Sequence, residues 1–227
     1  MTPNQPPPPP PPGRSLAAAV HRPLAEQLAA LAAPGPDERV LELGAGDGEL
    51  TERLLGATTG SGTVEVQVRP WNLAVADGTF DLAVSLLALH PDQELAAVLS
   101  ELARIAMRAQ VAVWTDGATH ENALRAAWHD VAGEDLAATT LPERSAPAHD
   151  GWRQSRLRDV ARFDGVDHAL VALTAERGIS VPAGVRTALR DRLAHHLAAC
   201  TAADGTLRIP VHADVLSWGD DQPGARP

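Results

Sequence analysis

Several residue types and patterns are scarce or missing from this sequence. Its 227 residues include no tyrosine, two phenylalanines and one cysteine, and the net charge is −10. One cysteine, Cys200, excludes an intramolecular disulfide and a zinc site of four thiolates. No apolar run approaches the roughly 20 residues that a membrane span needs. Few aromatic rings and no basic stripe argue against nucleic-acid binding. We therefore expect a cytoplasmic protein with neither a membrane nor a nucleic acid as its partner.

Apolar residues, mostly alanine, leucine and valine, make up 44% of the chain, which is enough for one well-buried domain. Prolines crowd the start, "MTPNQPPPPPPPG", where an extended polyproline II tail is expected. The composition predicts a disordered tail over 1–15, a single domain over 16–218 and a second disordered tail over 219–227.

Apolar periodicity between residues 16 and 116 predicts the order helix, strand, helix, strand, strand, helix, strand. Leu24, Leu28 and Leu31 share one helical face, "TVEVQV" alternates strictly, and "FDLAVSLLAL" is continuously apolar, as in an interior strand. This alternation is typical of an α/β fold with a doubly wound, mostly parallel sheet.

The second half of the chain differs from the first in its composition and its apolar pattern. Helical patterns over 121–133 and 185–202 flank a polar stretch, and we expect 117–200 to form a helical cap over a substrate. The closing segment, 205–219, predicts antiparallel strands with a break at Pro210. We interpret Arg153, Arg156, Arg158 and Arg162 as one solvated face of a helix. The alternative is that they form a site for an acidic substrate.

The stretch "VLELGAGDGEL", residues 40–50, joins an apolar strand to a helix through three glycines. At the carboxyl end of a parallel strand, such a turn lets a ligand approach the backbone. A dinucleotide loop would need a third glycine where Glu49 stands, and Glu49 places negative charge where a pyrophosphate would bind. A nicotinamide-dependent reductase is therefore a disfavoured alternative. A phosphate loop is excluded because no Gly-Lys-Ser/Thr follows.

The ordered motifs "VLELGAGDG", "ADGTFDLAVSLLALH" and "ELARIAM" resemble those of the class I S-adenosylmethionine-dependent methyltransferases that act on small molecules. The helix before the first motif and the closing strands are also similar, so the resemblance covers roughly residues 16–218. It implies a Rossmann-like methyltransferase sheet, S-adenosylmethionine as the cofactor and a small-molecule acceptor.

The resemblance also implies roles for individual residues. Glu42 would attract the amino end of the cofactor, and the glycine turn would lie against its carboxylate and ribose. Leu87 would lie near the substrate mouth, and His90 is a weak candidate for a general base. We expect no metal site, because no carboxylate or further histidine stands at ligand spacing from the His195–His196 pair. The implied cofactor-binding residues are Glu42, Gly44, Ala45, Gly46, Gly48, Ser85 and Leu86.

One strand and one helix of the family pattern are missing after the glycine turn. The family has a second strand that ends in a ribose-binding acid and a third that ends in an adenine-binding acid. Here "TVEVQV" is the only strand, and we align it with the third, which puts Arg69 in place of the adenine acid and leaves Glu65 solvated. The alternative makes Glu65 the ribose acid. Trp71 would stack on adenine or pack under a loop. A catalytically inactive, methyltransferase-like binding or regulatory protein is the alternative function.

Overall fold

A computed structural model describes residues 14–46, 48–67, 75–89, 95–114, 119–133, 150–176 and 179–219. The first helix begins at Arg14, so the last two residues of the tail predicted over 1–15 are helical. Residues 1–13 and 220–227, the rest of the two predicted tails, lie outside the described residues. Outside them too lie Arg69, Trp71 and His90.

The centre of the molecule is a six-stranded sheet. Its strands are β1 (Arg39–Leu43), β2 (Thr63–Gln67), β3 (Phe80–Leu86), β4 (Ala106–Trp114), β5 (Arg153–Phe163) and β6 (Leu207–Trp218). They lie in the order β2-β1-β3-β4-β6-β5, in which the first four are parallel and β6 is antiparallel to both of its neighbours. The prediction of a doubly wound, mostly parallel sheet with antiparallel additions is confirmed.

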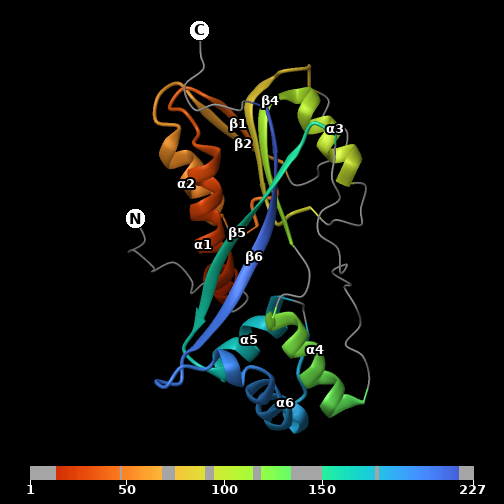
Figure 1. The fold of residues 1–227 in the computed structure, drawn as a ribbon. Helices are drawn as coiled ribbons and strands as arrows, with labels where there is room; N and C mark the ends of the chain where they lie inside the picture. Colours follow the sequence, from red (N-terminus) through yellow and green to blue (C-terminus); the bar gives the residue numbers. More distant parts are fainter. Residues whose placement is uncertain are drawn as a thin grey trace, which may run out of the picture.

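Six helices accompany this sheet in the described part of the chain. They are α1 (Arg14–Ala32), α2 (Glu49–Ala57), α3 (Leu95–Ile105), α4 (Thr119–Ala132), α5 (Val166–Glu176) and α6 (Ala183–His196). Figure 1 shows α1 and α2 together on one face and α3 on the other. Strand β1 alternates between the two layers: Val40 packs in the cluster that contains the leucines of α1 and α2, whereas Leu41 and Leu43 pack with α3. The strand is apolar on both sides because both sides are covered.

Strand β2 is the edge of the sheet in the described part of the chain and pairs directly with β1. In the doubly wound order 3-2-1-4-5-6, the strand beside the first is the second. By position, β2 is the second strand of that order, although its sequence aligns better with the third. The amide of Gly44 donates to the carbonyl of Gln67 at 2.8 Å, so the carboxyl end of β2 is level with the glycine turn.

Residues 117–200 contain more than the predicted helices. Helices α4, α5 and α6 pack against one another at the end of the sheet toward which β4 runs (Figure 1). The same segment supplies β5, which the sequence pattern did not predict. The residues from Arg153 to Arg156 are all exposed, and only Leu157, Ala161 and Phe163 mark a buried face, so the two-residue period is weak.

Strand β6 continues through Pro210 instead of breaking there. Its pairing with β4 begins only at Ala213, whereas its pairing with β5 extends to Leu207. Pro210 thus lies where one side of β6 has no ladder to complete, and a missing backbone N–H is tolerated at such a position.

Arg108 ties the end of α1 to the sheet from β4. Its guanidinium donates to the carbonyls of Ala32 and Ala33 and, at 2.6 Å, to the Glu38 carboxylate. These carbonyls belong to a helix end, where no intrahelical partner remains. We expect Arg108→Ala to lower the free energy of unfolding by about 2 kcal/mol or more, because it leaves a Glu38 side chain that is only 10% exposed without this partner. Urea unfolding measures the change.

The matched control is Arg190→Ala. Arg190 joins α6 to α5 through Asp167, but both side chains are largely exposed. Such an exposed pair contributes little to stability, because water and salt screen the attraction. An equal loss of stability in the two variants would contradict the role given to Arg108.

Candidate functional site

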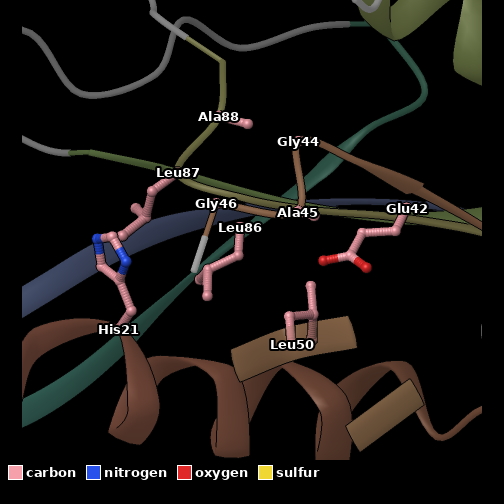
Figure 2. A pocket seen from close by; sticks show the side chains of 9 residues that line it. All are labelled: His21, Glu42, Gly44, Ala45, Gly46, Leu50, Leu86, Leu87 and Ala88. Atoms are coloured by element: carbon pink, nitrogen blue, oxygen red, sulfur yellow. The ribbon is translucent and has the colours of Figure 1, made fainter. Parts of the chain in front are cut away.

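A pocket of about 220 Å³ lies where β1 and β3 end, beside α1 and the start of α2 (Figure 2). Small-molecule sites commonly measure about 300–1,000 Å³, so this volume suits one end of a nucleoside-sized ligand. The carboxyl ends of parallel strands are where α/β sheets bind ligands. The pocket is lined by His21, Glu42, Gly44, Ala45, Gly46, Leu50, Leu86, Leu87 and Ala88.

Most of the residues that the sequence singled out meet at this pocket. Glu42, the turn from Gly44 to Gly46, and Leu86 all line it, as does Leu87. Gly48 and Ser85 do not belong to the lining. Gly48 occupies the N-cap position of α2, where its amide donates to the carbonyl of Ala45 at 2.8 Å.

Strand alternation explains why Glu42 reaches the pocket and Ser85 does not. Glu42 is on the same face of β1 as Val40, toward α1 and α2, and is 0% exposed. On β3, Leu86 shares the face of Leu82 and Val84, so Ser85 points to the opposite side. Its hydroxyl donates to the carbonyl of Leu43 at 3.1 Å and links the two strands.

The glycine turn brings two loops into contact. Gly44 has a φ of 72°, and a Cβ there would lie 2.3 Å from the Cβ of Ala88. The loop after β3 can therefore approach β1 only because this side chain is absent. Gly46 has a φ of 53°, but a Cβ on it would meet no atom within 4 Å. That open space is available to a ligand.

Three lining residues escaped the sequence analysis: His21, Leu50 and Ala88. His21 stands three residues before the fully buried Leu24, so it continues the inward stripe of α1 with a polar side chain. Leu50 is the first buried residue of α2. A polar residue on an apolar helical stripe is the one signal that the sequence offered for His21.

Two ion pairs join α1 to α2, the two helices that supply His21 and Leu50 to the pocket. The Arg22 guanidinium donates to both carboxylate oxygens of Glu49, at distances of 2.9–3.1 Å. This hydrogen bonding, followed by the attraction between the charges, raises the pKa of Arg22. One turn further on, Arg53 bonds Glu26 at 2.6 Å. The negative charge of Glu49 at the start of α2 is thus balanced by α1.

The end of β2 offers no acid for a ribose. Its last residue is the exposed Gln67. Glu65 lies two residues earlier, is 47% exposed and pairs with Arg39, at the opposite end of β1 from the glycine turn, at 3.6 Å. The interpretation of Glu65 as a solvated residue fits this geometry, and the alternative of a ribose acid does not. Among the described residues, the acid that lines the pocket is Glu42.

Other candidate sites lie elsewhere. The predicted helix face is wrong, because the arginines concerned stand on β5, outside the pocket lining. No group of three or more metal-ligating side chains occurs in the described ranges. His196 instead bonds Asp130 at 3.0 Å, which joins α6 to α4 and lowers the pKa of Asp130. None of the helices described is long and apolar enough to cross a membrane.

Comparisons with known proteins fall into two groups. No family model matches the chain, and no curated protein sequence does. Solved structures do match. The cyclopropane-fatty-acyl-phospholipid synthase-like protein from Lactobacillus casei has a TM-score of 0.52 and 17% identity over 90% of this chain and 92% of that one. The YcgJ protein from Bacillus subtilis has a TM-score of 0.49 and 12% identity over 88% of this chain and 99% of that one. A geranyl diphosphate methyltransferase in complex with S-adenosylmethionine has a TM-score of 0.39 and 12% identity over 85% of this chain and 84% of that one.

The chain has a Rossmann-like, class I methyltransferase fold. The likeness to the Lactobacillus casei protein covers 90% of this chain, so it extends beyond the glycine turn and the parallel strands. At 17% identity it shows the fold alone, and the ligand has to be argued from the pocket.

Proposed function

We propose that the chain binds S-adenosylmethionine in the pocket beside Glu42 and catalyses methyl transfer to a small-molecule acceptor. The observation that carries this proposal is the position of Glu42. Its carboxylate is buried at the end of β1, in the wall of a pocket that the turn from Gly44 to Gly46 leaves open. A buried acid beside exposed backbone suits a ligand with an ammonium group and a sulfonium, whereas it repels a phosphate.

Each part of the pocket has a role in this proposal. Glu42 attracts the amino group of the cofactor, and the backbone of Gly44, Ala45 and Gly46 lies against its amino-acid end and ribose. Leu50 and Leu86 exclude water, which strengthens the electrostatic contacts inside. The bound cofactor supplies a methyl group that is already activated on a positive sulfur. Holding that methyl group in line with the acceptor then accounts for most of the rate.

The acceptor side of the site belongs to the helices at the sheet's end. Helices α4, α5 and α6 gather beyond the end of the sheet toward which β4 runs (Figure 1). Strands β1 and β3, whose ends line the pocket, run in the same direction. We assign them the role of a cap over a small molecule. We propose the cytoplasm as the location of the reaction. His90 is still a candidate for the general base, although it lies outside the described residues.

Titration calorimetry with S-adenosylmethionine and S-adenosylhomocysteine tests the proposal. We expect a dissociation constant between about 10 µM and 1 mM, because one acid in a small pocket supplies only a few charge-assisted contacts. Ligand at ten times this constant is expected to raise the melting temperature by a few degrees. The proposal would be excluded if ligand at about 10 mM, ten times the weakest expected constant, produced no heat and no thermal stabilisation.

The absence of an acid at the end of β2 favours one alternative. Gln67 is the last described residue of β2, so within the described part of the chain no acid stands there to bind the ribose hydroxyls, and the domain could bind the cofactor without turning it over. A methyltransferase-like binding or regulatory protein would show cofactor-dependent stabilisation and no formation of S-adenosylhomocysteine with any acceptor pool. Detection of that product by mass spectrometry would exclude this alternative.

A further inference from the structure

The pocket has an ionisable side chain on each of two opposite sides. Figure 2 shows the Glu42 carboxylate reaching in from β1 and the His21 imidazole from α1, with Leu50 and Leu86 between them. Glu42 is an acceptor when it is ionised, whereas an imidazole offers at least one N–H donor in either protonation state. The two ends of the pocket therefore suit groups of opposite character.

The packing of α1 fixes His21 at this position. Leu24, Ala25 and Leu28 are 0% exposed and anchor the helix on the sheet. The neighbouring Arg22 is turned about 100° around the helix and binds Glu49 on α2. With one side of α1 held by the core and another by this ion pair, His21 cannot swing away from the pocket by rotation of the helix.

The wall beside His21 is held in an unusual conformation. Leu87 has a φ of 57°, which is uncommon for a residue with a bulky side chain. Its amide donates to the carbonyl of Ala112 at 2.8 Å, which secures the turn after β3. Such strain persists only where the surroundings impose it, and it often marks a ligand site. Here Leu87 and His21 both line the pocket (Figure 2).

We propose that His21 donates a hydrogen bond to the carboxylate of the cofactor's amino-acid end, while Glu42 faces the ammonium group. This inference rests on the proposed function and assigns to α1 a positioning residue that holds the amino-acid end in place. The amino-acid end of the cofactor carries an ammonium and a carboxylate, so a pocket with an acid in one wall and a hydrogen-bond donor in another matches it. The leucines between them keep water out and strengthen both contacts.

Two ligands separate this role from simple packing. S-adenosylhomocysteine carries the amino-acid end, whereas 5′-methylthioadenosine has the nucleoside and the sulfur without it. We expect His21→Leu to weaken binding of S-adenosylhomocysteine about tenfold to a hundredfold, the effect of losing one charge-assisted hydrogen bond. Binding of 5′-methylthioadenosine should change less than about twofold. His21→Gln keeps an N–H donor and should recover most of the lost affinity.

His195→Gln is the matched control, because this histidine is exposed on α6 and absent from the pocket lining. Its affinities should equal those of the unaltered chain, and circular dichroism melting should show that all variants fold. Equal losses for both ligands in His21→Leu would overturn the inference and leave the proposed function standing. If neither ligand binds the unaltered chain at about 10 mM, the inference and the proposed function are both excluded.

Discussion

Replacing Glu42 by glutamine is expected to weaken the binding of S-adenosylmethionine about tenfold to a hundredfold while the chain stays folded. The change keeps the size of the side chain and removes its negative charge. Glu42 is 0% exposed, so bulk water does not screen its attraction for a cationic ligand. The loss corresponds to one charge-assisted contact of about 1.5–3 kcal/mol. Titration calorimetry measures the affinity, and circular dichroism checks the fold.

Glu65→Gln is the control for this experiment. Glu65 is an acid in the neighbouring strand, but it is half exposed and paired with Arg39 away from the glycine turn. Its replacement should change the affinity less than about twofold, because an exposed pair contributes little. If both variants weakened the binding of S-adenosylmethionine equally, Glu65 would be the ribose acid after all, and Glu42 would have no special role in binding.

The second large effect concerns Gly44. We expect Gly44→Ala to lower the free energy of unfolding by about 3 kcal/mol, because a side chain at positive φ costs about 1–2 kcal/mol and the contact with Ala88 adds more. For a chain of this size, the melting temperature should fall by about 6–12 °C. Thermal unfolding followed by circular dichroism measures the shift.

Gly46→Ala separates the fold from the site. Its added methyl group meets no protein atom within 4 Å, so only the cost of the positive φ, about 1 kcal/mol, is expected. The same methyl group enters the open space of the pocket and should weaken S-adenosylhomocysteine binding about tenfold or more. If Gly44→Ala proves as stable as Gly46→Ala, the close approach of the loop after β3 is wrong.

The local patterns predicted the layered part of the fold well. Continuous apolar runs such as "FDLAVSLLAL" become strands with helices on both faces, and the period of α1 places Leu24 and Leu28 in the core. Leu31, assigned to the same stripe, is 44% exposed, whereas Ala32 is buried. The buried stripe of α1 therefore ends one residue later than the leucine pattern indicated.

The pattern failed where contacts between distant segments decide the structure. Strand β5 is held by eleven paired positions on β6, a segment about 50 residues away. The alternation of buried and exposed residues within β5 itself is too weak to predict a strand. The position of β2 in the sheet could not be predicted either. An edge strand exposed on most of its residues carries no local mark of which neighbour it joins, so only its pairing with β1 identifies it as the second strand.

The sequence by itself determined the fold class, the strand that carries Glu42 and the glycine turn after it. These features depend on residues close in the chain, and apolar periodicity and the loss of side chains are visible there. Tertiary structure decided which side chains meet at the pocket. His21 joins Glu42 because α1 packs across the sheet, and Ser85 drops out because its position on β3 faces the other layer. Facing and packing are set by non-local contacts, which no single stretch of sequence contains.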